Sequence, residues 1–266
     1  MIKDITYNYL IEDSFENFPS DFDINNRKDP DKMGESLYES LKDLYFKNSQ
    51  FKVENKRKRD FYTKTSSYYT LYINDGEFLL SSDYIGPSIY WASEAGIEDE
   101  KIINYLKIAR TIGGHMLWPR GKKPTVNQAK AGRKGFHDRI DWTLLAIDIF
   151  YKTVIKNKND ETHFILKCNK LLPFEISNTN EYDDKFRGIY KALKTHESWF
   201  ETFTTFNEFC DFFKLKGSFV DKEYTVTELA PLYPMLPKNY EKYSDNNIDI
   251  ISKRNLNLFN EVVIQY

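Results

Sequence analysis

Apolar residues recur with the spacing of an amphipathic helix in several parts of the chain, and two of these stretches are long. Over residues 97–112 the apolar side chains share one face, and acidic residues fill the first turn, where the helix dipole favours them. From Phe136 or His137 to Tyr151 the apolar side chains surround most of the helix, which is typical of a buried helix. Further helices are predicted over 36–46, 186–193, 199–213 and 240–266.

Extended segments are fewer. The runs YYTLYI and EFLLSS flank Asn74-Asp75-Gly76, which predicts a β-hairpin at about 68–82. Two more extended segments are expected over 115–118, ended by Pro119, and over 163–174. The pattern contains no repeat and no linker, so we expect one α+β domain spanning residues 1–266. It should be mainly helical, with a small antiparallel sheet that includes the hairpin.

Composition narrows the class of protein. Aromatic residues make up 16% of the chain, which excludes a disordered polypeptide. The two cysteines, Cys168 and Cys210, form neither a disulfide framework nor a zinc-binding set. The N-terminus lacks the apolar core of a signal peptide, and no apolar run approaches the roughly 20 residues of a membrane span. We therefore expect a cytoplasmic protein without a membrane partner. The sequence identifies no cofactor and no oligomeric state.

The acidic segment near the N-terminus allows two interpretations. Asp21, Asp23, Asp29 and Asp31 lie close together in the sequence and could supply an oxygen-only metal loop. The segment lacks the glycine and the terminal glutamate of an EF-hand, so a solvated, turn-rich surface is favoured and no metal site is predicted.

Positive charge is concentrated in one place. The basic segment, defined here as residues 120–139, carries seven of the 38 Lys and Arg residues but one of the 40 Asp and Glu residues. A basic segment on an otherwise acidic chain suggests a local anionic ligand. Its glycines permit close backbone approach to a phosphate, and Trp118 could stack on a base. It is not a Walker loop, because GKKPT lacks the preceding glycine at the required spacing. The alternative is a solvated loop without a ligand.

The end of this segment contains candidate catalytic and anion-binding residues. His137 and Asp141 are four residues apart, so on a helix they would share a face, and the carboxylate could orient the imidazole for acid-base work. Arg139 and Thr143 have the same spacing, and a helix N-terminus is itself a site for anions. The structural alternative is that Asp138 stabilises the first turn while His137 lies near the cap.

Two further groups of residues are weaker candidates. Arg110 and His115 match the short Arg-x4-His motif of helical endoribonucleases, but the two glycines between them are expected to end the helix. Arg110 could instead cap that helix. Ser82 and Asp83 stand at the exit of a predicted strand, where they could contact a ligand or cap the next helix.

Several segments together resemble a family of bacterial proteins known only as a domain of unknown function. The segments RTIGGHMLWPRG, KPTVNQAKAG and HDRIDWTLLAIDIFY match its pattern TIGG…P, TINxARG and DRxDLTL, with EFLLSSDYIGP upstream. Residues near both ends are also similar: DFDINNRKDPDKMGESLYESL, NEFCDFFKLKGSFVD and LPKNYEKY…ISKRN. The matching positions are Ser82, Asp83, Gly113, Gly114, Pro119, Asn127, Ala129, Asp138, Arg139, Asp141 and Thr143.

The resemblance implies no mechanism, and the chain departs from the family pattern at two places. The family arginine after Ala129 is Lys130 here, which weakens the case for a bidentate phosphate contact. His115 is not fixed in the family pattern, which weakens the ribonuclease interpretation.

Taken together, the residues favour a protein that binds a nucleotide or nucleic acid. The proposed ligand contacts are Arg110, Arg120, Asn127, Lys130, Arg133, Arg139, Thr143, Ser82 and Asp83. Any catalysis would use His137 or His115 with Asp141, as in a bacterial toxin or phage-defence effector that acts on RNA or a nucleotide. The alternative is a non-catalytic module in which the loop at 120–135 docks an acidic protein surface.

Overall fold

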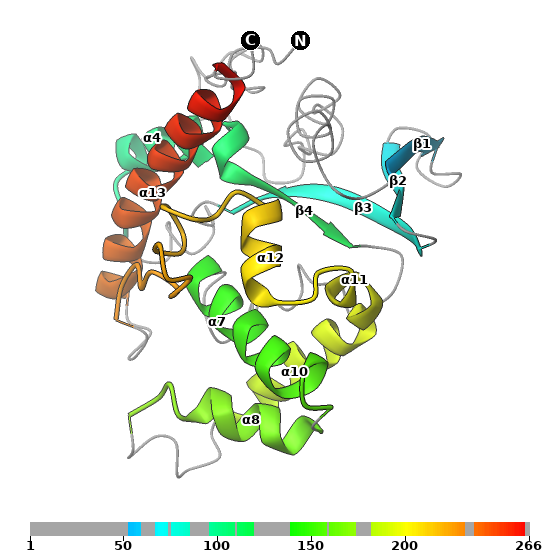
Figure 1. Cartoon of the computed structure of the whole chain (residues 1–266). Helices are drawn as coiled ribbons and strands as arrows, with labels where there is room; N and C mark the ends of the chain where they lie inside the picture. The colour runs from blue at the N-terminus through cyan, green and yellow to red at the C-terminus, as the bar shows by residue number, and fades with distance from the viewer. Residues whose placement is uncertain are drawn as a thin grey trace.

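The computed structural model describes residues 53–59, 67–73, 76–85, 96–109, 111–119, 139–158, 160–173, 182–231 and 237–263. Within these residues the protein is mainly helical, as predicted. Figure 1 shows the strands on one side of the molecule and the helices between Ile140 and Phe212 gathered on the other, with the helix Pro237–Val263 running alongside the helix Asp99–Ala109. The assignment of the whole chain to a single α+β domain stays a prediction.

The described strands pair in sequence order and antiparallel, β1-β2-β3-β4. Their bounds are β1 Val53–Arg59, β2 Ser67–Ile73, β3 Gly76–Tyr84 and β4 His115–Pro119. Ile73 pairs with Gly76, so two residues separate β2 from β3, the loop length that a tight hairpin turn requires. In the pairing of β3 with β4, Tyr84 lies opposite His115 and Leu80 opposite Pro119.

The helix predicted over 199–213 is two helices in the structure, Glu197–Glu201 and Phe206–Phe212. The other helices differ from the predicted ones mainly in where they begin and end. Instead of running to Ile112, α4 ends at Ala109, and a 3-10 turn that contains both glycines follows. Instead of starting at Phe136 or His137, α7 starts at Ile140, after Arg139 in an extended conformation. The bounds are α4 Asp99–Ala109, η3 Ile112–Gly114, α7 Ile140–Phe150, the π-helix η4 Tyr151–Ile155, α8 Glu161–Asn169, α10 Asp183–Thr195, α11 Glu197–Glu201, α12 Phe206–Phe212 and α13 Pro237–Val263.

The predicted strand over 163–174 is wrong, because this segment forms α8. The Asp160 side chain accepts a hydrogen bond from the backbone N–H of His163 and so caps the helix. Phe164, Ile165 and Cys168 are buried, a spacing that places them on one face of a helix.

Aromatic side chains fill the core between the sheet and the helices. The ring of Phe78 on β3 meets Trp199 edge-on with a centroid distance of 5.2 Å. On β4, Trp118 stacks on Phe213 at 6.4 Å. The prediction that α7 is buried on most sides is confirmed, because eight of its eleven residues are buried. No helix in the described part of the chain combines the length and apolar character that a membrane span requires.

Candidate functional site

The first turn of α7 is held by an ion pair inside the protein. Arg139 precedes the helix, and its guanidinium donates through Nε to Oδ1 of Asp141 at 3.0 Å and through Nη2 to Oδ2 at 2.5 Å. Arg139 is 1% exposed and Asp141 is also 1% exposed. A buried ion pair of this kind stabilises a structure only where the remaining donors and acceptors find partners as well.

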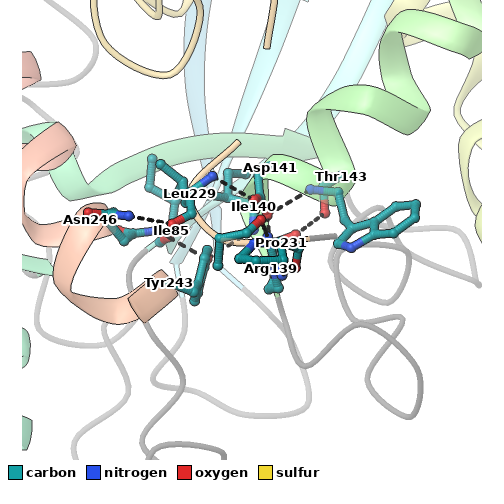
Figure 2. A network of polar contacts seen from close by, with 12 residues as sticks. Ile85, Arg139, Ile140, Asp141, Thr143, Leu229, Pro231, Tyr243 and Asn246 are labelled. Carbon is teal, nitrogen blue, oxygen red and sulfur yellow. Dashed lines mark hydrogen bonds and ion pairs between the residues drawn. The ribbon is translucent and has the colours of Figure 1, made fainter. Parts of the chain in front are cut away.

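Those remaining groups are bonded to one irregular segment, residues 229–231. Arg139 donates through Nη2 to the carbonyl of Ala230 and through Nη1 to that of Pro231, both at 2.8 Å. Oδ2 of Asp141 accepts the backbone N–H of Leu229 at 3.0 Å. The pair therefore ties the start of α7 to a stretch of chain about 90 residues later (Figure 2).

The helix α13 completes this arrangement through Tyr243. The Tyr243 hydroxyl accepts the backbone N–H of Ile140 at 3.0 Å and the side-chain N–H of Asn247 at 3.0 Å. The Arg139 guanidinium lies over the Tyr243 ring, 5.2 Å from its centroid. Figure 2 shows Tyr243 facing Arg139 and Ile140. We define the Arg139 network as Arg139, Asp141, Tyr243 and residues 229–231.

These contacts determine whether the N-terminus of α7 has N–H groups available to bind an anion. A helix N-terminus binds anions through N–H groups that the helix leaves without partners. Here the N–H of Ile140 is donated to Tyr243, and that of Trp142 is donated to Oδ1 of Asp141 at 2.9 Å. The Thr143 hydroxyl donates to the carbonyl of Arg139 at 3.1 Å. The geometry therefore favours a structural role for this helix start over the predicted anion site.

A second buried arginine holds the residues before and at the start of β4. Arg254 on α13 is 0% exposed and donates through Nη1 to the carbonyls of Gly113 and His115, at 2.8 and 2.9 Å. Through Nη2 it donates to the carbonyl of Phe213 at 2.6 Å. The neighbouring Asn255 accepts the N–H of Gly113 at 2.7 Å. We call these five residues the Arg254 network.

Both glycines of the TIGG motif are required by close packing. A Cβ on Gly113 would lie 2.6 Å from Oδ1 of Asn255. A Cβ on Gly114 would lie 2.0 Å from the carbonyl oxygen of Ala109, a backbone atom that cannot turn away as a side chain could. The glycines thus allow α4, η3 and α13 to meet.

The remaining predicted site residues are not brought together in the described part of the structure. His115 is 0% exposed on β4, while Asp141 belongs to the Arg139 network, so these two of the three candidate catalytic residues lie in separate networks. Ser82 pairs with Leu117 and Asp83 with Met116 in the sheet, which places their backbones only. The other candidates lie outside the described residues: His137, Arg110, Arg120, Asn127, Lys130 and Arg133.

Residues that sequence reasoning missed come from α13. Neither Tyr243 nor Arg254 was among the candidates, although both fall in the segment LPKNYEKY…ISKRN that carries the resemblance. They are eleven residues apart, which corresponds to about three helical turns and places them on nearly the same face. A search for polar residues at this spacing on a predicted helix could have indicated them.

The described residues do not provide a metal site or a reactive thiol. Within them, no group of three or more His, Cys, Asp or Glu side chains is arranged to bind a metal ion. The acidic segment around Asp21–Asp31 lies outside them. Burial raises the pKa of the Cys168 thiol and of the Cys210 thiol, which keeps both protonated at neutral pH.

Comparison with known proteins places the chain in a family. Residues 13–163 and 180–258 match the model of a family of unknown function, DUF6994. The chain therefore belongs to this family, in agreement with the resemblance seen in its segments. Both networks fall within the matched residues. Comparisons with curated proteins and with solved structures gave no match.

Proposed function

We propose that this member of DUF6994 binds a phosphate-bearing ligand, a nucleotide or RNA, through its basic segment. The observation that carries the proposal is the concentration of charge in the basic segment, which besides Arg139 contains six basic residues and one acidic residue in a chain of net charge −2. Lys and Arg side chains are common protein contacts to phosphate groups. The segment is bounded by two buried residues, Pro119 and Arg139, which fix where it leaves and re-enters the fold.

The proposed contacts are Arg120, Asn127, Lys130 and Arg133. Arg139 is left out of this set, because its guanidinium already donates to Asp141 and to residues 230 and 231. The proposal ends at binding and assigns no reaction. Catalysis by His115 with Asp141 would require two buried side chains from separate networks to meet a ligand.

The experiment measures binding of a fluorescein-labelled single-stranded RNA oligonucleotide by fluorescence anisotropy across a series of salt concentrations. The wild-type Kd should rise steeply with salt, because binding to phosphates releases counterions. Replacing Lys130→Ala together with Arg133→Ala should weaken binding and reduce the log–log salt slope by about 1.4, which corresponds to two lost contacts with a single strand. A separate titration with a fluorescently labelled nucleoside triphosphate tests whether a nucleotide is bound instead.

The matched control is Lys167→Ala with Lys170→Ala, which removes two positive charges from exposed positions in and next to α8. This variant should keep the wild-type Kd and salt slope. Equal losses in both double variants would show attraction by net charge alone. Absence of RNA and nucleotide binding at low salt would rule out the proposal. Binding of polyglutamate without RNA binding would support the protein-interaction alternative.

A further inference from the structure

One helix holds the chain on both sides of the basic segment. After the segment, Tyr243 accepts the N–H of Ile140 and lies under the guanidinium of Arg139. Before it, Arg254 donates to the carbonyls of Gly113 and His115, where β4 begins. Because β4 ends at Pro119, the basic segment starts at the next residue.

The two contacts come from one buried face of α13. Tyr243 and Arg254 are both 0% exposed. Their separation of eleven residues corresponds to a rotation of only about 20° and a rise of about 16 Å along the helix axis. A shift of α13 along or about its axis would therefore move both contacts together. Figure 1 shows α13 extending along this side of the molecule beside α4.

We propose that Tyr243 and Arg254 are positioning residues, through which the docking of α13 is coupled to ligand binding by the basic segment. This inference rests on the proposed function. Affinity depends on how far the binding groups are ordered in advance, and α13 orders the residues on which the segment is mounted. By linkage, a ligand that binds the docked state more tightly must stabilise the docking of α13 by the same factor.

The first test compares two tyrosines that each use a buried hydroxyl. Tyr243→Phe removes the acceptor for Ile140, and Tyr151→Phe removes a donor to the carbonyl of Phe200 at 2.9 Å, within the helical layer. Tyr243→Phe should weaken binding of the labelled RNA about fivefold or more, and Tyr151→Phe should leave the Kd within about twofold of wild type. Both measurements are made well below the melting temperature of each variant, so that loss of stability alone does not move the Kd.

The second test reads the coupling in the opposite direction by hydrogen exchange on the full chain. Saturating RNA should slow exchange of the α13 amides between 243 and 254 in the wild type, while the amides of α10 serve as an internal control. In Tyr243→Phe this protection should shrink.

The outcomes separate the two proposals. If wild-type protein binds neither RNA nor nucleotide at low salt, the proposed function fails and this inference falls with it. If wild-type protein binds RNA, but the two tyrosine variants have the same Kd and α13 gains no protection, the proposed function stands and the coupling is refuted. Weaker binding in Tyr243→Phe alone, together with protection of α13, supports the coupling.

Discussion

The Arg139–Asp141 pair allows a quantitative test of whether the start of α7 serves structure or function. In Asp141→Asn the arginine keeps its charge in a buried setting but loses its counter-ion. In Arg139→Met the carboxylate is left with two backbone N–H donors, and the carbonyls of Ala230 and Pro231 each lose a donor. Removing one partner of a buried pair typically costs about 3–5 kcal/mol, because the remaining charge is left uncompensated.

The double variant, Arg139→Met with Asp141→Leu, separates the ion pair from the packing around it. It removes both charges, so the buried charge without a partner disappears. We expect its loss of stability to be smaller than the sum of the two single losses, with a coupling of about 1–3 kcal/mol. The two backbone carbonyls still lose their donors, so the double variant should remain less stable than the wild type.

The assay is equilibrium unfolding in urea, followed by tryptophan fluorescence, since Trp142 lies next to the pair in the chain and is 1% exposed. The control is Arg187→Met, which breaks the bond to Glu161 on the surface between α8 and α10 and should change the urea midpoint little. The reasoning is refuted if Asp141→Asn unfolds at the same urea concentration as the control. A stable Asp141→Asn variant that loses ligand binding would instead return Asp141 to the candidate site.

Three further predictions test other parts of the structure. Gly114→Ala should strongly lower the free energy of unfolding, because its Cβ would meet the carbonyl of Ala109. Gly188→Ala, on α10 with open space around the new Cβ, should raise the free energy of unfolding measured in urea by about 0.4–1 kcal/mol. The hydrogen bond with the His163 side chain lowers the pKa of the Asp160 carboxyl, so its stabilising contribution is present above the ordinary Asp pKa and lost as pH falls through the lower folded value. Asp160→Ala should therefore lower the melting temperature at pH 7, more than Asp160→Asn does, with the difference from wild type narrowing in acid. Both cysteines are buried with raised pKa, so a thiol reagent such as Ellman's reagent should label them only as the protein unfolds.

The hydrophobic pattern predicted the elements that bury apolar side chains on several faces. It indicated that α7 is buried because no polar stripe interrupts it, and the structure confirms this. It misjudged α8, since a short apolar run does not distinguish a strand from a helix by periodicity. The N-cap at Asp160 was the local signal that decides between them, and it lies just outside the apolar run.

The same pattern could not predict the polar interior of α13. A helix over 240–266 was expected from the spacing of its apolar residues, among them Leu256. In the structure Leu256 is 59% exposed, while Arg254, two residues earlier, is 0% exposed. Burial of an arginine depends on carbonyl groups that come from distant parts of the chain, which local sequence does not reveal.

The positions of the two buried arginines explain why polar residues are required there at all. Arg139 donates to the carbonyls of Ala230 and Pro231 in an irregular segment. Arg254 donates to the carbonyls of Gly113 in the 3-10 turn η3, of His115 at the first position of β4 and of Phe213 just after α12. A buried carbonyl without a donor costs free energy comparable to a lost hydrogen bond, and an apolar side chain would fill the same space without supplying a donor. A guanidinium offers five N–H donors in a fixed plane and can satisfy several carbonyls at once. The two arginines therefore supply donors where the hydrogen bonds of helices and strands end, and they hold in place the chain on either side of the basic segment.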